Sequence, residues 1–66
     1  MYTQAVTTAT FVVYQDRAGG FRWTMVAANG LKIADSGEAY TTRSGAREAA
    51  ERVKRLAPTA PIKDQY

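Results

Sequence analysis

The sequence predicts an α+β fold in which a three-stranded antiparallel meander is covered by one amphipathic helix and followed by a C-terminal strand. Apolar and polar residues alternate in the first half of the chain, as they do in half-buried strands. From Ala46 onward, apolar residues recur at steps of three and four, which is the period of a helix. The chain has 66 residues, so it forms one domain at most. A domain of this size buries only about 60% of its unfolded surface.

The chain has no cysteine and no histidine, so neither disulfides nor the common zinc sites can supplement so small a core. Association with a second copy is the remaining supplement, and we expect a homodimer. The same absence removes the usual general base near neutral pH and the readiest nucleophile. We therefore expect no enzymatic activity, no metal and no cofactor.

The first strand is predicted at Phe11–Tyr14, which is β-branched and aromatic. Residues 1–9 are rich in threonine and alanine without a pattern, and we expect a flexible lead-in before a single domain over residues 10–66. Gly19 and Gly20 end the strand, because a hairpin loop needs backbone angles that glycine tolerates.

The second predicted strand begins at Phe21 and contains the only tryptophan, Trp23. A large flat side chain in mid-strand can hold together a small core. The length of the loop before this strand decides which side chains share a face. A four-residue loop would place Val12 and Tyr14 on the Trp23 side of the sheet.

A three-residue loop reverses that choice. It places Phe11 opposite Ala27 and Val13 opposite Met25. We prefer this loop because it places the larger ring, Phe11, on the core side and the phenol of Tyr14 toward water.

Asn29-Gly30 predicts a tight hairpin turn into a third strand at Leu31–Asp35. A strict two-residue turn pairs Val26 with Ile33 on the face away from the core. One extra loop residue brings Ile33 round to the core side. Either the turn is longer than the dipeptide suggests or the second face is partly covered, and the sequence leaves both open.

The helix is predicted to begin after Thr41–Ser44, which offers several possible caps. Its apolar residues occupy a single stripe, with charged residues on the other side. The stripe consists of Ala46, Ala49, Ala50, Val53, Leu56 and Ala57. Because it is rich in alanine, it contributes far less burial than a leucine stripe, at about 0.8 kcal/mol per buried CH₂.

Two acid-first pairs at four-residue spacing are expected to add about 0.2–0.5 kcal/mol each to the helix: Glu48–Arg52 and Glu51–Arg55. Pro58 disfavours helical angles at the preceding residue and should end the element.

The residues leave two interpretations of the tail after Pro61 open: a disordered tail, or a strand that pairs elsewhere. Two prolines stiffen the link before it and hold it away from its own helix. Exchange of an identical element is a low-cost route to a dimer.

The order of segments resembles a known family. FVVYQDRAGGFRWTMVAANG, then GEAY, then a helix containing VK and the exit APTAP are similar to the YegP-like family of small bacterial and archaeal proteins of unknown function. The resemblance spans residues 11–63. It implies a unit of three strands, one helix and one strand, two of which share one sheet and swap their last strands. For this single-unit chain it implies a homodimer in which the C-terminal segment crosses over, with a dimer interface of Ile62, Lys63 and Asp64. It implies no catalytic residues.

The net charge of +3 lies wholly between Arg43 and Arg55, where five basic residues accompany two acidic ones. A basic helix face can neutralise phosphates, and an aromatic sheet face can stack bases. The candidate surface for a protein partner or nucleic acid consists of Arg43, Arg47, Lys54, Arg55, Tyr14 and Arg22. We favour a small non-catalytic binding or interaction module of unknown target, acting as a homodimer, over weak, sequence-independent nucleic-acid binding, because Glu48 and Glu51 would repel phosphate.

No stretch approaches the roughly 20 apolar residues that cross a bilayer. The first ten residues contain no lysine or arginine and no sustained apolar run, unlike a secretory signal. We expect a cytoplasmic location and no membrane contact. An open sheet face bearing Val26, with Tyr14 or Ile33, is the expected docking surface for a protein partner.

Overall fold

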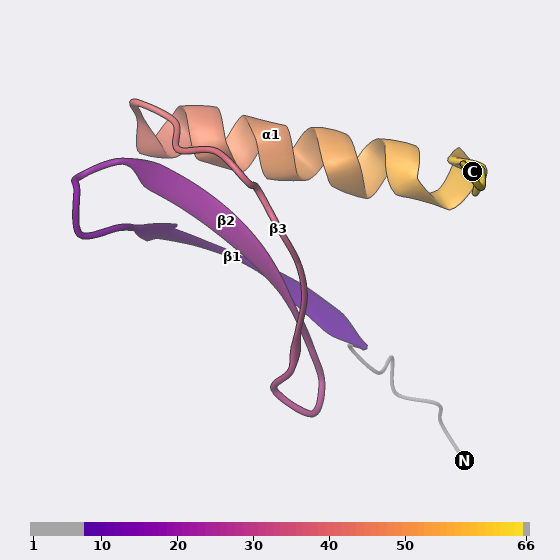
Figure 1. Ribbon diagram of the computed structural model, residues 1–66. Coiled ribbons are helices and arrows are strands. Elements are labelled where there is room, and N and C mark those ends of the chain that lie inside the picture. Colours follow the sequence, from indigo (N-terminus) through magenta and orange to yellow (C-terminus); the bar gives the residue numbers. More distant parts are fainter. Residues whose placement is uncertain (1–7, 66) are drawn as a thin grey trace, which may run out of the picture.

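A computed structural model describes residues 8–65 as an antiparallel sheet with one helix across one face (Figure 1). The elements are β1 (Ala9–Gln15), β2 (Phe21–Ala27), β3 (Lys32–Asp35), α1 (Arg43–Leu56) and a 3₁₀ turn η1 (Ala57–Thr59). The strands lie in the order β1-β2-β3. The predicted α+β meander with its helix is therefore confirmed.

The sheet begins slightly earlier in the chain than predicted. Ala9 belongs to β1, and the Thr8 carbonyl accepts a hydrogen bond from the Ala28 N–H at 2.9 Å. The end of the expected lead-in, residues 8 and 9, is thus part of the sheet. The rest of that expectation, residues 1–7, lies outside the described residues.

The first hairpin has the predicted three-residue loop, Arg17–Gly19. The Asp16 N–H donates to the Gly20 carbonyl at 2.8 Å, and the Gly19 N–H donates to the Asp16 carbonyl at 3.1 Å. Gly19 takes a φ of 94°, which closes a tight turn of this kind. The Asp16 carboxylate also accepts the Gly20 N–H at 2.9 Å and so fixes where the loop starts.

The predicted core face is correct, but the predicted partners are wrong by two residues. Phe11 lies opposite Met25, and Val13 lies opposite Trp23. The reason is the loop position, because Asp16 and Gly20 form the last pair of the ladder. The rings of Phe11 and Trp23 meet edge to face at a centroid distance of 5.4 Å.

The second hairpin uses the same three-residue construction, so its turn is longer than Asn29-Gly30 alone suggests. The Ala27 N–H donates to the Leu31 carbonyl at 2.8 Å, and Gly30 takes a φ of 90°. The register then shifts, since the neighbours Met25 and Val26 pair with Ala34 and Lys32. Ile33 is left between them without a partner.

The bulge explains why Ile33 does not join the core. One extra loop residue alone would have turned this side chain toward the helix. A bulge adds a further residue to one strand and cancels that rotation. Ile33 remains 57% exposed.

The helix begins at a threonine cap. Thr42 has extended backbone angles, and its hydroxyl accepts the Gly45 N–H at 2.9 Å. The α-helix ends at Leu56, as Pro58 predicts, but Ala57 keeps helical angles (φ −56°, ψ −40°) and continues into η1. Pro58 therefore ends the helix mainly because it has no N–H to donate, and the expected effect on Ala57 is wrong.

Only the first part of the predicted stripe is buried. Among the described residues the buried core consists of Trp23, Ala46, Ala49 and Ala50. Val53 is half-buried, whereas Leu56 is 53% exposed because the last turns of α1 extend beyond the sheet (Figure 1). The radius of gyration is 14.2 Å, against about 11 Å for a compact domain of this length. The single chain is open.

The tail has no regular structure in the single chain. Residues 60–65 belong to no helix or strand, and Ile62 is 96% exposed. The expected C-terminal strand is therefore not part of this chain's own sheet.

Candidate interaction surfaces at the β1 edge and the helix

Among residues 8–65, no strand pairs with the outer edge of β1, so the backbone groups along it have no partner there. Thr8 and Asp16 direct their backbone groups toward β2. Antiparallel strands alternate in this respect, so every second residue of β1 points its N–H and C=O away from the sheet. These outward residues are Ala9, Phe11, Val13 and Gln15. β1 has seven residues, none of them charged.

The opposite edge of the sheet is protected. β3 has only four residues and contains the bulge at Ile33. It carries two charges, Lys32 and Asp35, whose side chains lie 3.4 Å apart. Short length, charges and a bulge are the usual means of blocking edge pairing. The sheet therefore has one open edge and one blocked edge.

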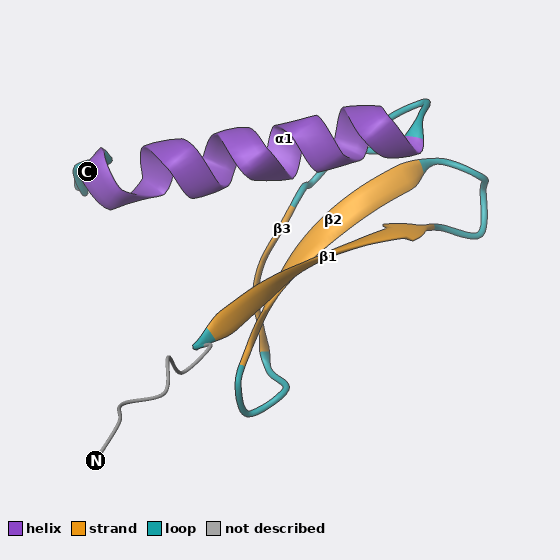
Figure 2. Cartoon of the chain, turned by 180° about the vertical axis from the view of Figure 1, so that it is seen from behind, coloured by secondary structure: helices purple, strands orange, loops and turns teal. Residues whose placement is uncertain are grey.

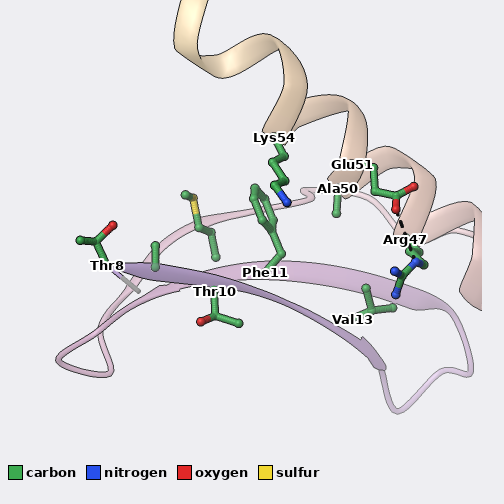
Figure 3. Close-up of a pocket in the computed structure, with 10 residues that line it drawn as sticks. Thr8, Thr10, Phe11, Val13, Arg47, Ala50, Glu51 and Lys54 are labelled. Atoms are coloured by element: carbon green, nitrogen blue, oxygen red, sulfur yellow. Dashed lines mark ion pairs between the residues drawn. The ribbon is translucent and has the colours of Figure 1, made fainter. Parts of the chain in front are cut away.

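An open cleft of about 650 Å³ lies between β1 and α1 (Figure 3). Its apolar floor consists of Phe11, Val13, Met25 and Ala50. The helix adds a charged rim of Arg47, Glu51 and Lys54. The cleft runs along the open edge of β1, so a segment that paired with β1 could also place apolar side chains in it.

No local sequence pattern predicts this cleft. The helical stripe indicated that Ala50 faces the sheet, and the strand alternation placed Phe11 on the same side. Neither pattern shows that β1 curves away from α1 (Figure 1), and the cleft lies where the two separate.

A second groove, of about 460 Å³, lies under the last turns of α1 on the side of Trp23 and Tyr40. From the helix it is lined mainly by Val53, Leu56 and Ala57. Burial, together with the nearby carboxylate of Glu38, raises the pKa of the Tyr40 hydroxyl above its usual value. This groove is mainly apolar, with Ser36 and Arg52 also in its lining.

The predicted basic residues lie along α1, but several have partners within the chain. The Arg43 guanidinium lies 5.1 Å from the centre of the Phe21 ring, a cation–π distance. Arg47 pairs with Glu51 at 3.6 Å. Glu51 therefore pairs toward the start of the helix, and the predicted Glu51–Arg55 pair is wrong.

The other predicted helix pair, Glu48–Arg52, is not formed within the described residues either. Lys54 and Arg55 likewise have no carboxylate at ion-pair distance in that part of the chain. Lys54 extends from α1 toward Phe11 at the cleft (Figure 3).

Tyr14 and Arg22 lie together on the other face of the sheet, since they are cross-strand partners. Arg22 donates to the Asp16 carboxylate at 2.8 Å. This hydrogen bond lowers the pKa of Asp16 and raises the pKa of Arg22. The six predicted surface residues thus lie on opposite faces of the molecule and do not form one site.

No group of three or more metal-ligating side chains occurs among residues 8–65. Over the same residues, no helix is both long and apolar enough to span a bilayer. The expected interface residues Ile62, Lys63 and Asp64 are exposed in the tail.

Residues 16–64 match a family described as a domain of unknown function, DUF1508. The chain belongs to this family. A UPF0339 protein of Neisseria meningitidis serogroup B is 35% identical over 54 residues, which are 82% of this chain and 95% of the relative. A UPF0339 protein of Treponema denticola is 38% identical over 52 residues, 79% of this chain and 88% of the relative. The predicted resemblance to a family of unknown function is confirmed.

Another DUF1508-type relative is much longer than this chain. The UPF0339 protein in the ptx operon 5′ region of Stutzerimonas stutzeri is 45% identical over 49 residues, which are 74% of this chain but only 43% of the relative. The fold also matches a solution NMR structure of a protein from Haloferax volcanii, with a TM-score of 0.82 and 40% identity. That match covers 91% of this chain and 100% of the other.

Proposed function

We propose that this member of DUF1508 is a non-catalytic binding module whose working unit is a homodimer. In this dimer, residues 62–64 of each copy pair as a strand with β1 of the other copy, so that both copies share one sheet. The observation that supports the proposal best is the outer edge of β1, which is regular, uncharged and seven residues long. Native proteins seldom leave such an edge open, because it pairs with any available strand.

The packing of the single chain supports the same proposal. Its buried core is one tryptophan and three alanines, while Leu56 and Ile62 are exposed. The cleft beside β1 has an apolar floor that a strand on that edge would cover. In both views the C-terminal tail lies at the far end of α1, beyond the sheet (Figures 1 and 2). A tail in that position is well placed to reach a neighbouring copy.

The length of the Stutzerimonas stutzeri relative agrees with a two-unit assembly. More than half of that protein lies outside the matched region. A second unit of similar size would fit in the remainder, and two units in one chain would do what two copies do here.

The test is the solution mass of the full chain at micromolar concentration, by sedimentation equilibrium. We expect twice the chain mass of 7.2 kDa. A chain that ends at Ala60 lacks the tail and should have the single-chain mass. A full chain that remains monomeric at high micromolar concentration would contradict the proposal, as would a truncated chain that dimerises equally well.

For the target of the module we propose a protein that docks on the sheet face away from α1. On this face Val12 is 42% exposed and Tyr14 is 37% exposed, and Val26 is half-buried. The test is co-purification from the native cell with a tagged chain and with its Val12→Lys variant. A partner of this face should be recovered with the unchanged chain and lost with the variant, whereas Arg55→Glu, on the helix, should retain it. Equal recovery with all three chains would place the partner elsewhere.

A second candidate function is weak nucleic-acid binding through the helix. Lys54 and Arg55 favour it, since neither has an ion-pair partner in the described part of the chain. Counterion release makes such binding strongly dependent on salt. Labelled single- and double-stranded oligonucleotides, titrated at low and moderate salt, test it. Triple substitution of Arg47, Lys54 and Arg55 by glutamate should abolish the binding. Absence of binding at low salt would remove this candidate, and undiminished binding by the variant would remove the helix as its site.

A further inference from the structure

The rim of the cleft beside β1 contains one cation without a partner. Arg47 is neutralised by Glu51 at 3.6 Å. Lys54 lies seven positions later, which is about two turns or 10.5 Å along the helix axis. Within residues 8–65 no carboxylate lies at ion-pair distance from Lys54, although its side chain lines the cleft. A segment in the cleft would therefore meet an apolar floor and one free positive charge.

The tail carries the complementary pattern. In a strand, alternate side chains point to the same face, so Ile62 and Asp64 lie on one face and Lys63 on the other. Two residues of a strand span about 6.6 Å. With Ile62 over the floor at Phe11, the carboxylate of Asp64 is within reach of one end of the helical rim. At the other end of the rim, Arg47 is already paired with Glu51, so Lys54 is the available cation.

We infer that Lys54 recognises Asp64 of a second copy and thereby sets the register in which the exchanged strand pairs with β1. The inference rests on the proposed function, since it names the contact that positions the exchanged tail on β1. The apolar floor alone would tolerate a slip of two residues along the edge. A slip of two residues would move Asp64 away from Lys54 and leave the Asp64 carboxylate without a partner.

Two single substitutions test the contact in trans. Lys54→Glu places a glutamate opposite Asp64 in a dimer of two identical variants. Asp64→Lys places a lysine opposite Lys54. Because each dimer contains the contact twice, each variant alone should dimerise about tenfold more weakly than the unchanged chain.

Mixing the two variants is the decisive step. In the mixed dimer, the tail of the Lys54→Glu chain meets an unchanged Lys54, and the lysine introduced at position 64 meets the introduced glutamate. Both contacts then join opposite charges. The mixed dimer should be at least about tenfold tighter than either variant alone and should form in preference to both. Native mass spectrometry resolves the three species if one variant carries a short tag.

Matched controls carry the same changes of charge away from the contact. Arg55→Glu alters the neighbouring helix residue, and Glu48→Lys alters a carboxylate in the first half of α1 that does not line the cleft. Neither should change dimer affinity more than about twofold, and their mixture should pair at random.

The outcomes separate this inference from the proposed function. If the unchanged chain is a monomer, the homodimer proposal fails and this inference fails with it. If the unchanged chain is a dimer but the mixed variants pair at random, only the Lys54–Asp64 contact is refuted. Preferential mixing of Lys54→Glu with Asp64→Lys, without preference among the controls, would support it. A chain that carries both Lys54→Glu and Asp64→Lys tests for a contact within one copy. If this chain regains stability as a monomer, the contact forms within one chain and the inference is overturned.

Discussion

Replacement of Ala9 by proline should weaken the dimer while leaving the meander intact. Ala9 points its N–H away from β2, toward the edge where the exchanged strand is proposed to pair. Proline removes this donor, and its ring obstructs a neighbouring strand, yet edge strands accept it. One backbone hydrogen bond contributes about 0.5–1.5 kcal/mol net. A twofold dimer loses two, so its dissociation constant should rise by roughly 5- to 150-fold.

The matched variant is Thr10→Pro, one residue later. Thr10 pairs with Val26 and directs its N–H into the sheet, so proline there breaks the β1–β2 ladder. Sedimentation equilibrium measures association, and the fluorescence of Trp23, which is 6% exposed, reports the fold. Ala9→Pro should change association only, whereas Thr10→Pro should shift the fluorescence as well. An Ala9→Pro chain that dimerises as tightly as the unchanged chain would refute pairing at this edge.

Three further predictions concern the stability of the unit. Gly20→Ala should cost about 1–3 kcal/mol on overpacking grounds, because the new Cβ would lie 2.7 Å from that of Ala39; urea unfolding that matches the unchanged chain would contradict this. Thr42→Ala should cost about 1 kcal/mol by loss of the helix cap, and Thr42→Ser, which keeps the hydroxyl, should cost much less. Asp16→Asn should reduce stability at neutral pH by weakening the bond to Arg22; unfolding midpoints measured from pH 7 to 2 test it.

The sign of the last effect follows from the pKa of Asp16. Its bond to Arg22 lowers that pKa in the folded chain. A lowered carboxyl pKa stabilises the fold above the unfolded value, about 3.9, and the stabilisation is lost as the pH falls through the folded value. The gap between the unchanged chain and Asp16→Asn should therefore be widest near neutral pH and close in acid. A gap that stays constant over the whole range would contradict the argument.

The sequence predicted those parts of the fold that depend on local patterns. The alternation around Trp23 gave the second strand, and the alanine stripe gave the buried face of the helix. The registers were harder, because each depends on one residue. Asp16 closes the first loop one position earlier than assumed, and the bulge at Ile33 cancels the effect of the longer second turn. Neither a capping carboxylate nor a bulge has a periodicity to detect.

The candidate surfaces were predicted less well, since side chains close in sequence can face opposite ways. Arg22 was grouped with the helix cations by charge, but it lies across the sheet and is bound to Asp16. The cleft beneath Lys54 lies where β1 curves away from α1, and no local pattern encodes that separation. The two prolines and Ile62 indicated that the tail can pair as a strand, and this pairing stays a prediction.

The contrast between the two sheet edges also bears on the size of the assembly. If both edges were open, chains could add to one another without limit and form extended sheets. Here the β3 edge is blocked by its bulge and by the Lys32–Asp35 pair. With one open edge and one donated strand per chain, a twofold exchange covers the β1 edge of both copies. We therefore expect the mass to stay at that of a dimer as concentration rises, and Lys32→Ala combined with Asp35→Ala to permit larger species. Growth of the unchanged chain beyond a dimer would show that β3 also pairs.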